Sequence, residues 1–71
     1  MGAVHNTIES LLNEHDVAKI LGVSVATVRR WRLLSTGPRY IKVGVLVKYR
    51  GSDLQNWLAS RPTGGTYLEA R

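Results

Sequence analysis

Two helix-start patterns that lie close together along the chain constrain its fold more than any other feature. In the first, Asn13 takes the N-cap position and Asp16 follows three residues later, near the positive end of the expected helix. The second pattern also begins with an N-cap residue, Ser24. Between them, Gly22 is the residue type that most easily adopts the left-handed conformation in which helices commonly end. The sequence therefore predicts two short helices joined by a tight turn.

The two helices are expected over residues 14–21 and 25–34. The turn between them is too short for the helices to lie antiparallel. The helices must cross steeply, which defines a helix-turn-helix. Ala18 is small enough to let the second helix pass close over the first. The apolar faces of both helices are assigned to packing rather than to ligand contact. This core set is Val17, Leu21, Val23, Val28 and Trp31, with Leu33 or Leu34 at the end of the second face.

The spacing of apolar residues changes after Pro38, which cannot continue a helix. The β-branched and aromatic residues on both sides of Gly44 predict a two-stranded β-hairpin that turns within residues 43–46. Lys42 and Lys48 are expected on one exposed face of this hairpin. The hairpin residues assigned to the core are Ile41, Val43, Val47 and Tyr49.

A last helix is expected over residues 53–60. Ser52 as N-cap and Gln55 three residues later form the sequence pattern of a capping box. The buried face of this helix is predicted to contain Leu54, Trp57 and Leu58. The predicted fold is therefore α+β and mainly α: a helix-turn-helix, a hairpin wing and a C-terminal helix.

The length of 71 residues allows one small domain, and the absence of cysteine excludes disulfide bonds. We expect a flexible arm at residues 1–10, a domain at 11–61 and a flexible tail at 62–71. No secretory signal or membrane-spanning stretch is recognisable, so an intracellular location is expected.

Positive charge is concentrated in the middle of the chain. Ten Lys and Arg against five Asp and Glu give a net charge of +5, and residues 29–50 hold seven basic side chains and no acidic one. Because Lys and Arg supply most sequence-independent affinity for nucleic acid by neutralising phosphates, this distribution predicts a polyanionic partner. Single-stranded RNA readers expose aromatic side chains for stacking, whereas Trp31, Trp57 and Tyr49 are assigned here to the core. Duplex DNA is therefore favoured over RNA.

The second helix is the expected recognition element, because a helix that lies in the major groove reads base edges. Arginine contacts to guanine are the commonest specific contacts, and small apolar side chains suit thymine methyl groups. The predicted base contacts are Val25, Ala26, Arg29 and Arg30. The predicted phosphate contacts are Ser24, Thr27, Arg32, Arg39, Lys42, Lys48 and Arg50.

Nothing in the sequence predicts catalysis. His5 and His15 stand apart, no cysteine is present, and no pair of carboxylates has the spacing of metal ligands. Ser24 and Ser52 are interpreted as helix caps rather than nucleophiles. No metal, cofactor or small-molecule substrate is expected.

Three blocks of sequence, in this order, resemble the small phage and mobile-element excisionases and related regulators. The blocks are LLNEHDVAKILGVSVATVRRW at residues 11–31, GPRYIKVG at 37–44 and VKYRGSDLQNWL at 47–58. The DNA-binding domain of that family is a winged helix-turn-helix similar to that of the mercury-resistance regulators. The resemblance thus implies the fold that the residues themselves predict.

The resemblance also implies a function. An excisionase binds repeated DNA sites near an attachment site, bends the DNA and directs an integrase toward excision, in the cytoplasm and nucleoid of a bacterial host. The implied partners are double-stranded DNA, an integrase and further copies of the chain that bind cooperatively. A small transcriptional regulator with the same DNA-binding surface remains an alternative. Since no heptad repeat is present, a monomer is expected off DNA.

The predicted wing departs from the family pattern at its tip. Relatives usually carry basic residues after the hairpin glycine, whereas this chain has Val45 and Leu46. These residues are expected to contact a neighbouring protomer on DNA or to pack on the arm or tail of their own chain. A wedge into the minor groove is a further alternative.

Overall fold

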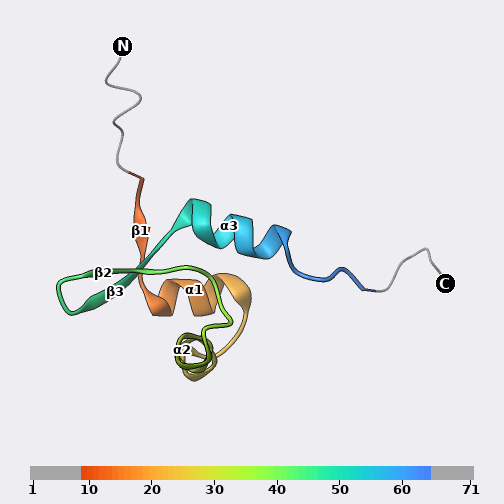
Figure 1. Cartoon of the computed structure of the whole chain (residues 1–71), viewed down its shortest axis with the longest axis horizontal. Helices are drawn as coiled ribbons and strands as arrows, with labels where there is room; N and C mark the ends of the chain where they lie inside the picture. Colours follow the sequence, from red (N-terminus) through yellow and green to blue (C-terminus); the bar gives the residue numbers. More distant parts are fainter. Residues whose placement is uncertain (1–8, 65–71) are drawn as a thin grey trace, which may run out of the picture.

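A computed structural model describes residues 9–64 as three helices and three short strands (Figure 1). In chain order these are β1 (Leu11–Leu12), α1 (Glu14–Leu21), α2 (Val25–Leu34), β2 (Ile41–Val43), β3 (Leu46–Arg50) and α3 (Gly51–Ala59). The α+β winged helix-turn-helix is therefore confirmed. The arm and tail predicted to be flexible lie outside the described residues, apart from 9–10 and 62–64.

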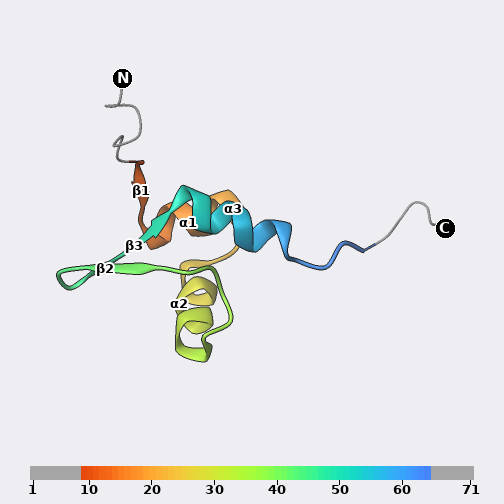
Figure 2. The ribbon, with the colours of Figure 1, turned by 45° about the horizontal axis from the view of Figure 1, so that its top comes forward.

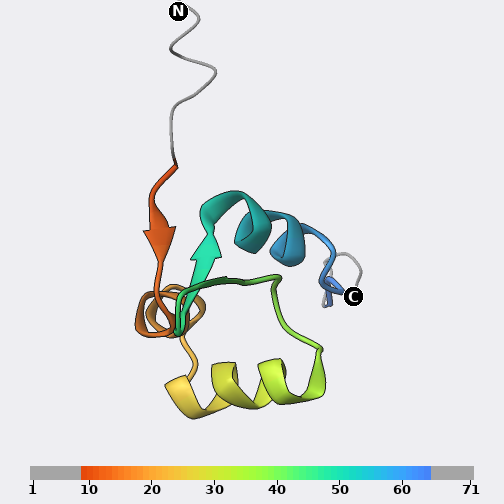
Figure 3. The ribbon, with the colours of Figure 1, turned by 60° about the vertical axis from the view of Figure 1, so that its left-hand side comes forward.

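α2 and α3 project on opposite sides of α1 (Figures 1 and 3). The hairpin of β2 and β3 extends away from all three helices (Figure 2). Residues of α2 and of the hairpin line a common hollow between these two elements.

The ends of α1 and α2 lie where the sequence predicts them. The Asn13 side chain accepts a hydrogen bond from the Asp16 amide at 2.8 Å, and the Asp16 carboxylate accepts one from the Asn13 amide at 3.0 Å. Gly22 ends α1 with a φ of +70°. Ser24 Oγ accepts from the Thr27 amide at 3.1 Å and so caps α2. Local capping chemistry thus sets the tight turn between the two helices.

The three strands form one antiparallel sheet in the order β1-β3-β2. β1 was not predicted, because two residues are too short to show a period. It pairs with the end of β3, so that Leu12 lies opposite Tyr49. The hairpin turns at Gly44, whose φ of +64° favours glycine.

The predicted placement of Lys42 and Lys48 on one face of the hairpin is wrong. Ile41 pairs with Lys48, and Lys42 pairs with Val47. Because paired residues point to the same side of a ladder, the two lysines point to opposite sides. A turn of three residues would have paired them, but the turn contains only Gly44 and Val45.

The predicted capping box of α3 is also wrong. The helix begins at Gly51, with Arg50 as N-cap and no capping side chain from that residue. Ser52 instead donates to Glu9, from its amide to Oε1 and from its hydroxyl to Oε2, both at 3.2 Å. The acceptor for the helix N-terminus therefore comes from the residues before β1. A capping pattern of neighbouring residues cannot predict a partner that is 43 residues away.

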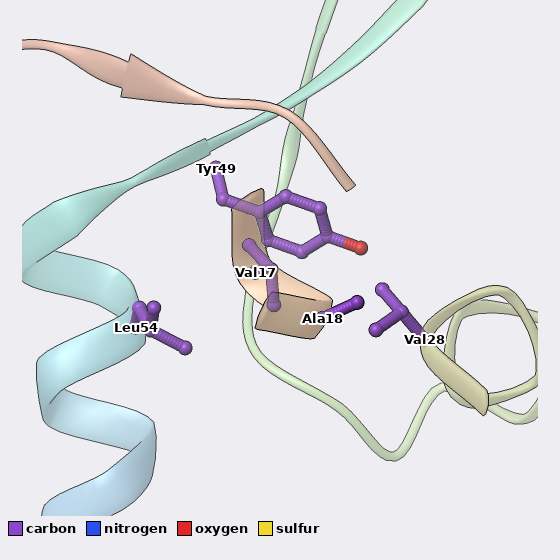
Figure 4. Close-up of a cluster of buried hydrophobic side chains, with 5 residues drawn as sticks. All are labelled: Val17, Ala18, Val28, Tyr49 and Leu54. Carbon is purple, nitrogen blue, oxygen red and sulfur yellow. The ribbon is translucent and has the colours of Figure 1, made fainter. Parts of the chain in front are cut away.

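The core lies where α1, α2, β3 and α3 meet. Its buried side chains are Val17, Ala18, Val28, Tyr49 and Leu54 (Figure 4). Ala18 and Val28 face each other across the helix crossing (Figure 4). The partly buried side chains packed against this core are Leu12, Leu21, Val23, Val25, Trp31, Val47 and Trp57.

Three residues of the hairpin and last helix that are predicted for the core lie outside it. Val43 and Leu58 are exposed, and Ile41 is only half-buried. Val43 and Ile41 share the side of the ladder that carries Lys48, away from Tyr49. On α3, Leu54 and Trp57 already fill the inward side, which leaves Leu58 at its edge.

Trp31 and Trp57 join α2 to α3 at one end of the molecule. Their ring centroids lie 5.2 Å apart, and Trp57 Nε1 donates to the Thr36 carbonyl at 3.3 Å. Gly37 lies directly against Trp31: a Cβ on Gly37 would stand 2.8 Å from Trp31 Cβ. The loop between α2 and β2 is thus pressed onto the indole.

Candidate nucleic-acid interface

Within residues 9–64, no other element covers an outward stripe on α2. Ala26, Arg30 and Leu33 are exposed, and their spacing of four and three residues places them on one side of the helix. Val28 is fully buried on the opposite side. The stripe combines one guanidinium group with two apolar side chains.

The sequence predicts that either Leu33 or Leu34 ends the core face of α2, and this prediction is wrong. Leu33 is 85% exposed and Leu34 56% exposed. Trp31 fills the inward position of the last turn, where it contacts Trp57.

Arg29 lies beside the stripe and pairs with Glu14, the first residue of α1. Arg29 Nε donates to Glu14 Oε2 at 3.1 Å, and Arg29 Nη2 donates to the same oxygen. The Arg29 side chain is nevertheless 56% exposed, whereas that of Glu14 is 18% exposed. An acidic residue that the sequence did not single out is therefore part of the surface around α2.

The hydrogen bond from Arg29 is the largest cause that lowers the pKa of Glu14 to about 2, and one from Arg32 adds to it against the opposing effect of desolvation. Glu14 in turn raises the pKa of Arg29 above its ordinary value. His15 Nε2 lies 3.8 Å from the same carboxylate. The carboxylate is consequently ionised at neutral pH.

Arg32, predicted to contact phosphate, is turned inward. Its Nη2 donates to Glu14 Oε1 and its Nη1 to the Tyr49 hydroxyl, both at 3.1 Å. Its guanidinium also lies 5.9 Å from the centre of the Tyr40 ring. The side chain is 19% exposed. Arg32 therefore links α1, α2 and β3, and little of it is available to a ligand.

Of the other α2 residues predicted to contact DNA, some are turned inward or used for capping and others are exposed. Val25 packs against the core. At the start of the helix, the Ser24 hydroxyl caps the Thr27 amide. The two hydroxyl oxygens, Ser24 Oγ and Thr27 Oγ1, lie 2.9 Å apart. Ala26 and Arg30 keep their predicted position on the outward side.

The basic residues of the hairpin and loop fall on two sides of the molecule. Lys42 lines a hollow with Arg29 and Leu33 between α2 and the hairpin. Lys48 lines a second hollow, which Arg29 also borders, between the start of α1 and the hairpin. Arg39 borders Asp53 and Trp57 of α3 and also a hollow with Arg32 and Ser35 at the end of α2. Arg50 Nη1 is 3.9 Å from an Asp53 oxygen. The sequence cluster of seven basic residues is thus not one surface.

The tip of the hairpin is apolar and uncovered among the described residues. Val45 is 89% exposed and Leu46 56% exposed. Between residues 9 and 64, no group of three or more His, Cys, Asp and Glu side chains is arranged to hold a metal ion. In the same part of the chain, no helix has the length and apolar character needed to cross a membrane.

Two comparisons with known proteins bear on this arrangement. A search of curated protein sequences gives no match. A family model described as a helix-turn-helix domain matches residues 11–62, which include every element from β1 to α3. Since this match covers most of the 71 residues, the chain belongs to that helix-turn-helix domain family.

Proposed function

We propose that the protein binds a specific sequence of double-stranded DNA, with α2 in the major groove. The observation that carries this proposal is the uncovered stripe of Ala26, Arg30 and Leu33 beside the basic side chains of the hairpin. The major groove admits an α-helix, and membership of a helix-turn-helix family indicates duplex DNA as the partner.

The stripe supplies the two kinds of contact that distinguish base pairs. Arg30 and the neighbouring Arg29 are assigned to guanine, which accepts a bidentate pair of hydrogen bonds at O6 and N7. Ala26 and Leu33 are assigned to thymine methyl groups. Leu33 joins the set because of its exposure, and Val25 leaves it because it packs inward.

Phosphate contacts are assigned to both borders of this stripe. Ser24 and Thr27 lie at the N-terminus of α2, where amide groups and the helix dipole favour an anion. Lys42 and Lys48 lie on the hairpin. Arg39 and Arg50, beside α3, contribute only to the positive potential at longer range.

Within DNA binding, we propose the role of an excisionase that occupies repeated sites near an attachment site. The three sequence blocks that resemble the excisionases support this role, and the exposed apolar tip at Val45 and Leu46 suits contact between neighbouring protomers on DNA. Several small proteins bound side by side would together bend the DNA and recruit an integrase.

The test is a mobility-shift and footprinting titration on DNA from the chain's own genetic neighbourhood, including any attachment site. Wild type is compared with Arg30→Ala and with Arg61→Ala, which removes the same charge beyond the end of α3. Arg30→Ala is expected to weaken the specific site by about 10- to 100-fold and Arg61→Ala by less than about threefold, because one bidentate contact carries that discrimination.

The outcomes separate the levels of the proposal. Stepwise shifts over phased repeats, together with stimulation of excision by the matching integrase, support the excisionase role. A single footprint over a promoter, without an effect on excision, indicates a transcriptional regulator. If wild type shows no preferred site at physiological salt, specific DNA recognition is excluded.

A further inference from the structure

Arg29 is held by one edge of its guanidinium group. Both Nε and Nη2 donate to the same oxygen of Glu14. The donors that remain are the two hydrogens of Nη1 and the second hydrogen of Nη2; one hydrogen from each nitrogen forms the second edge of the planar group. Among residues 9–64, Glu14 alone accepts from this guanidinium group, and the side chain is 56% exposed, so the second edge is available for a bidentate contact.

Glu14 is itself anchored to the core. Its other oxygen accepts from Arg32, and Arg32 donates to the hydroxyl of Tyr49, a side chain that is 1% exposed. Tyr49 reaches from β3 toward α2 (Figure 4). The contacts therefore form a continuous series from the buried centre of the domain to an exposed arginine on the flank of the recognition helix.

We propose that Glu14 is a positioning residue that orients Arg29 for base reading. An arginine on a helix surface normally samples many rotamers and loses that freedom when it binds. A partner that fixes the guanidinium plane beforehand reduces the loss and selects one direction for the contact. This inference rests on the proposed binding of DNA by α2.

The negative charge of Glu14 has a second effect. A carboxylate at the edge of a DNA-binding surface repels phosphate and so weakens binding to any sequence. Glu14 therefore lowers sequence-independent affinity while it raises affinity for the base that Arg29 reads. Both effects increase the ratio between specific and non-specific binding.

This pair of opposite effects separates positioning from a purely structural role. A structural residue, when removed, lowers affinity for every DNA in proportion to the loss of folded protein. Removal of Glu14 is instead expected to shift the two kinds of binding in opposite directions.

The experiment uses the full chain and measures equilibrium binding to the specific site, to every single-base variant of it and to non-specific duplex. Arg29→Ala first identifies the base pair at which discrimination is lost, by about tenfold or more. Glu14→Gln is expected to reduce discrimination at that same position by about three- to tenfold and to leave the other positions unchanged. Its non-specific affinity is expected to rise by about twofold or more.

Two variants serve as controls, and thermal unfolding of each shows that it is folded at the assay temperature. Asp16→Asn removes the same charge two residues away and is expected to raise non-specific affinity without changing discrimination at any base pair. Glu14→Asp keeps the charge but shortens the side chain, so it is expected to lose discrimination without the rise in non-specific affinity.

Uniform weakening by Glu14→Gln, or unchanged discrimination at the Arg29 position in both Glu14 variants, would overturn the inference. In that case Arg29→Ala and Arg30→Ala still test the proposed function. If neither arginine variant changes binding, or wild type prefers no site, the proposed function itself fails. The two failures are therefore distinguishable.

Discussion

Glu14 shows how a single side chain in this domain responds to pH. The pKa of Glu14 is lowered to about 2 in the folded protein, mainly by the hydrogen bond from Arg29, against an ordinary value of 4.5. Because the folded value lies below the unfolded one, the stabilisation by the carboxylate is complete above about pH 4.5 and is lost as the pH falls toward 2. His15 and Arg32 are the other charged or titratable groups beside it.

Glu14→Gln is therefore expected to lower the free energy of unfolding at pH 7 by about 1 kcal/mol, since solvent around the exposed Arg29 screens the pair. The difference from wild type should shrink between pH 4.5 and 2.5. Urea denaturation followed by circular dichroism across this range measures it. Arg29→Met, which removes the main partner, should weaken the same pH dependence; a gap between wild type and Glu14→Gln that stays constant with pH would contradict the expectation.

The candidate site was only partly predictable from residue type and spacing. Helical period alone places Arg30 and Ala26 opposite Val28, so their outward position followed from the sequence. The turn of Arg32 into the molecule did not, because its partners Glu14 and Tyr49 lie 18 and 17 residues away. Contacts across a helix crossing depend on side-chain direction, which a one-dimensional pattern does not contain.

Among the secondary-structure elements, α3 differs most from its sequence pattern at its start. β3 ends at Arg50 and α3 begins at Gly51, so no turn separates strand from helix. The amide and hydroxyl of Ser52 are satisfied by Glu9, a residue 43 positions away. The segment before β1 therefore contributes to the stability of the last helix.

Glu9→Ala is expected to reduce the free energy of unfolding by about 0.5–2 kcal/mol, the usual cost of losing a helix cap. It should also speed amide exchange at the start of α3. Gln55→Ala is the matched control, because Gln55 would be the reciprocal partner only in the capping box that the structure lacks; its effect should stay within about 0.5 kcal/mol. If Gln55→Ala destabilises as much as Glu9→Ala, the assigned cap is incorrect. Thermal denaturation and hydrogen exchange provide the two measurements.

The boundaries of α1 and α2 were predictable because their caps are local. Asn13, Gly22 and Ser24 each act within a few residues of their own position. The register of the hairpin was not predictable, because turns of two and of three residues both fit the alternating sequence around Gly44. This difference of one residue moved Lys42 and Lys48 to opposite sides of the sheet.

For the whole molecule, the arrangement of charge matters more than its sum of +5. Lys42 and Lys48 line hollows that Arg29 of α2 also borders, whereas Arg39 and Arg50 lie beside Asp53 of α3. Only the first pair lies next to the surface of α2 that is proposed to bind DNA. Two pairs of equal charge are therefore expected to differ in their effect on salt dependence.

The double variant Lys42→Ala and Lys48→Ala should reduce the slope of log K against log salt concentration by about 1.8, because each lost phosphate contact contributes about 0.9. The double variant Arg39→Ala and Arg50→Ala removes the same charge and should change the slope by less than about 0.5. Fluorescence anisotropy on the specific duplex, over a range of salt concentrations, measures both slopes. Equal slopes for the two variants would show that DNA also contacts the α3 side.

The contact of Gly37 with Trp31 has a consequence for how such a domain can change its target. The loop that carries the chain from α2 to the hairpin rests on the indole, and any side chain at residue 37 would collide with it. A Cβ at residue 37 would force the loop or the indole to move, and this loop connects α2 to the hairpin. Substitution of Gly37 is therefore expected to shift the hairpin relative to α2 without changing any of the side chains proposed to contact DNA.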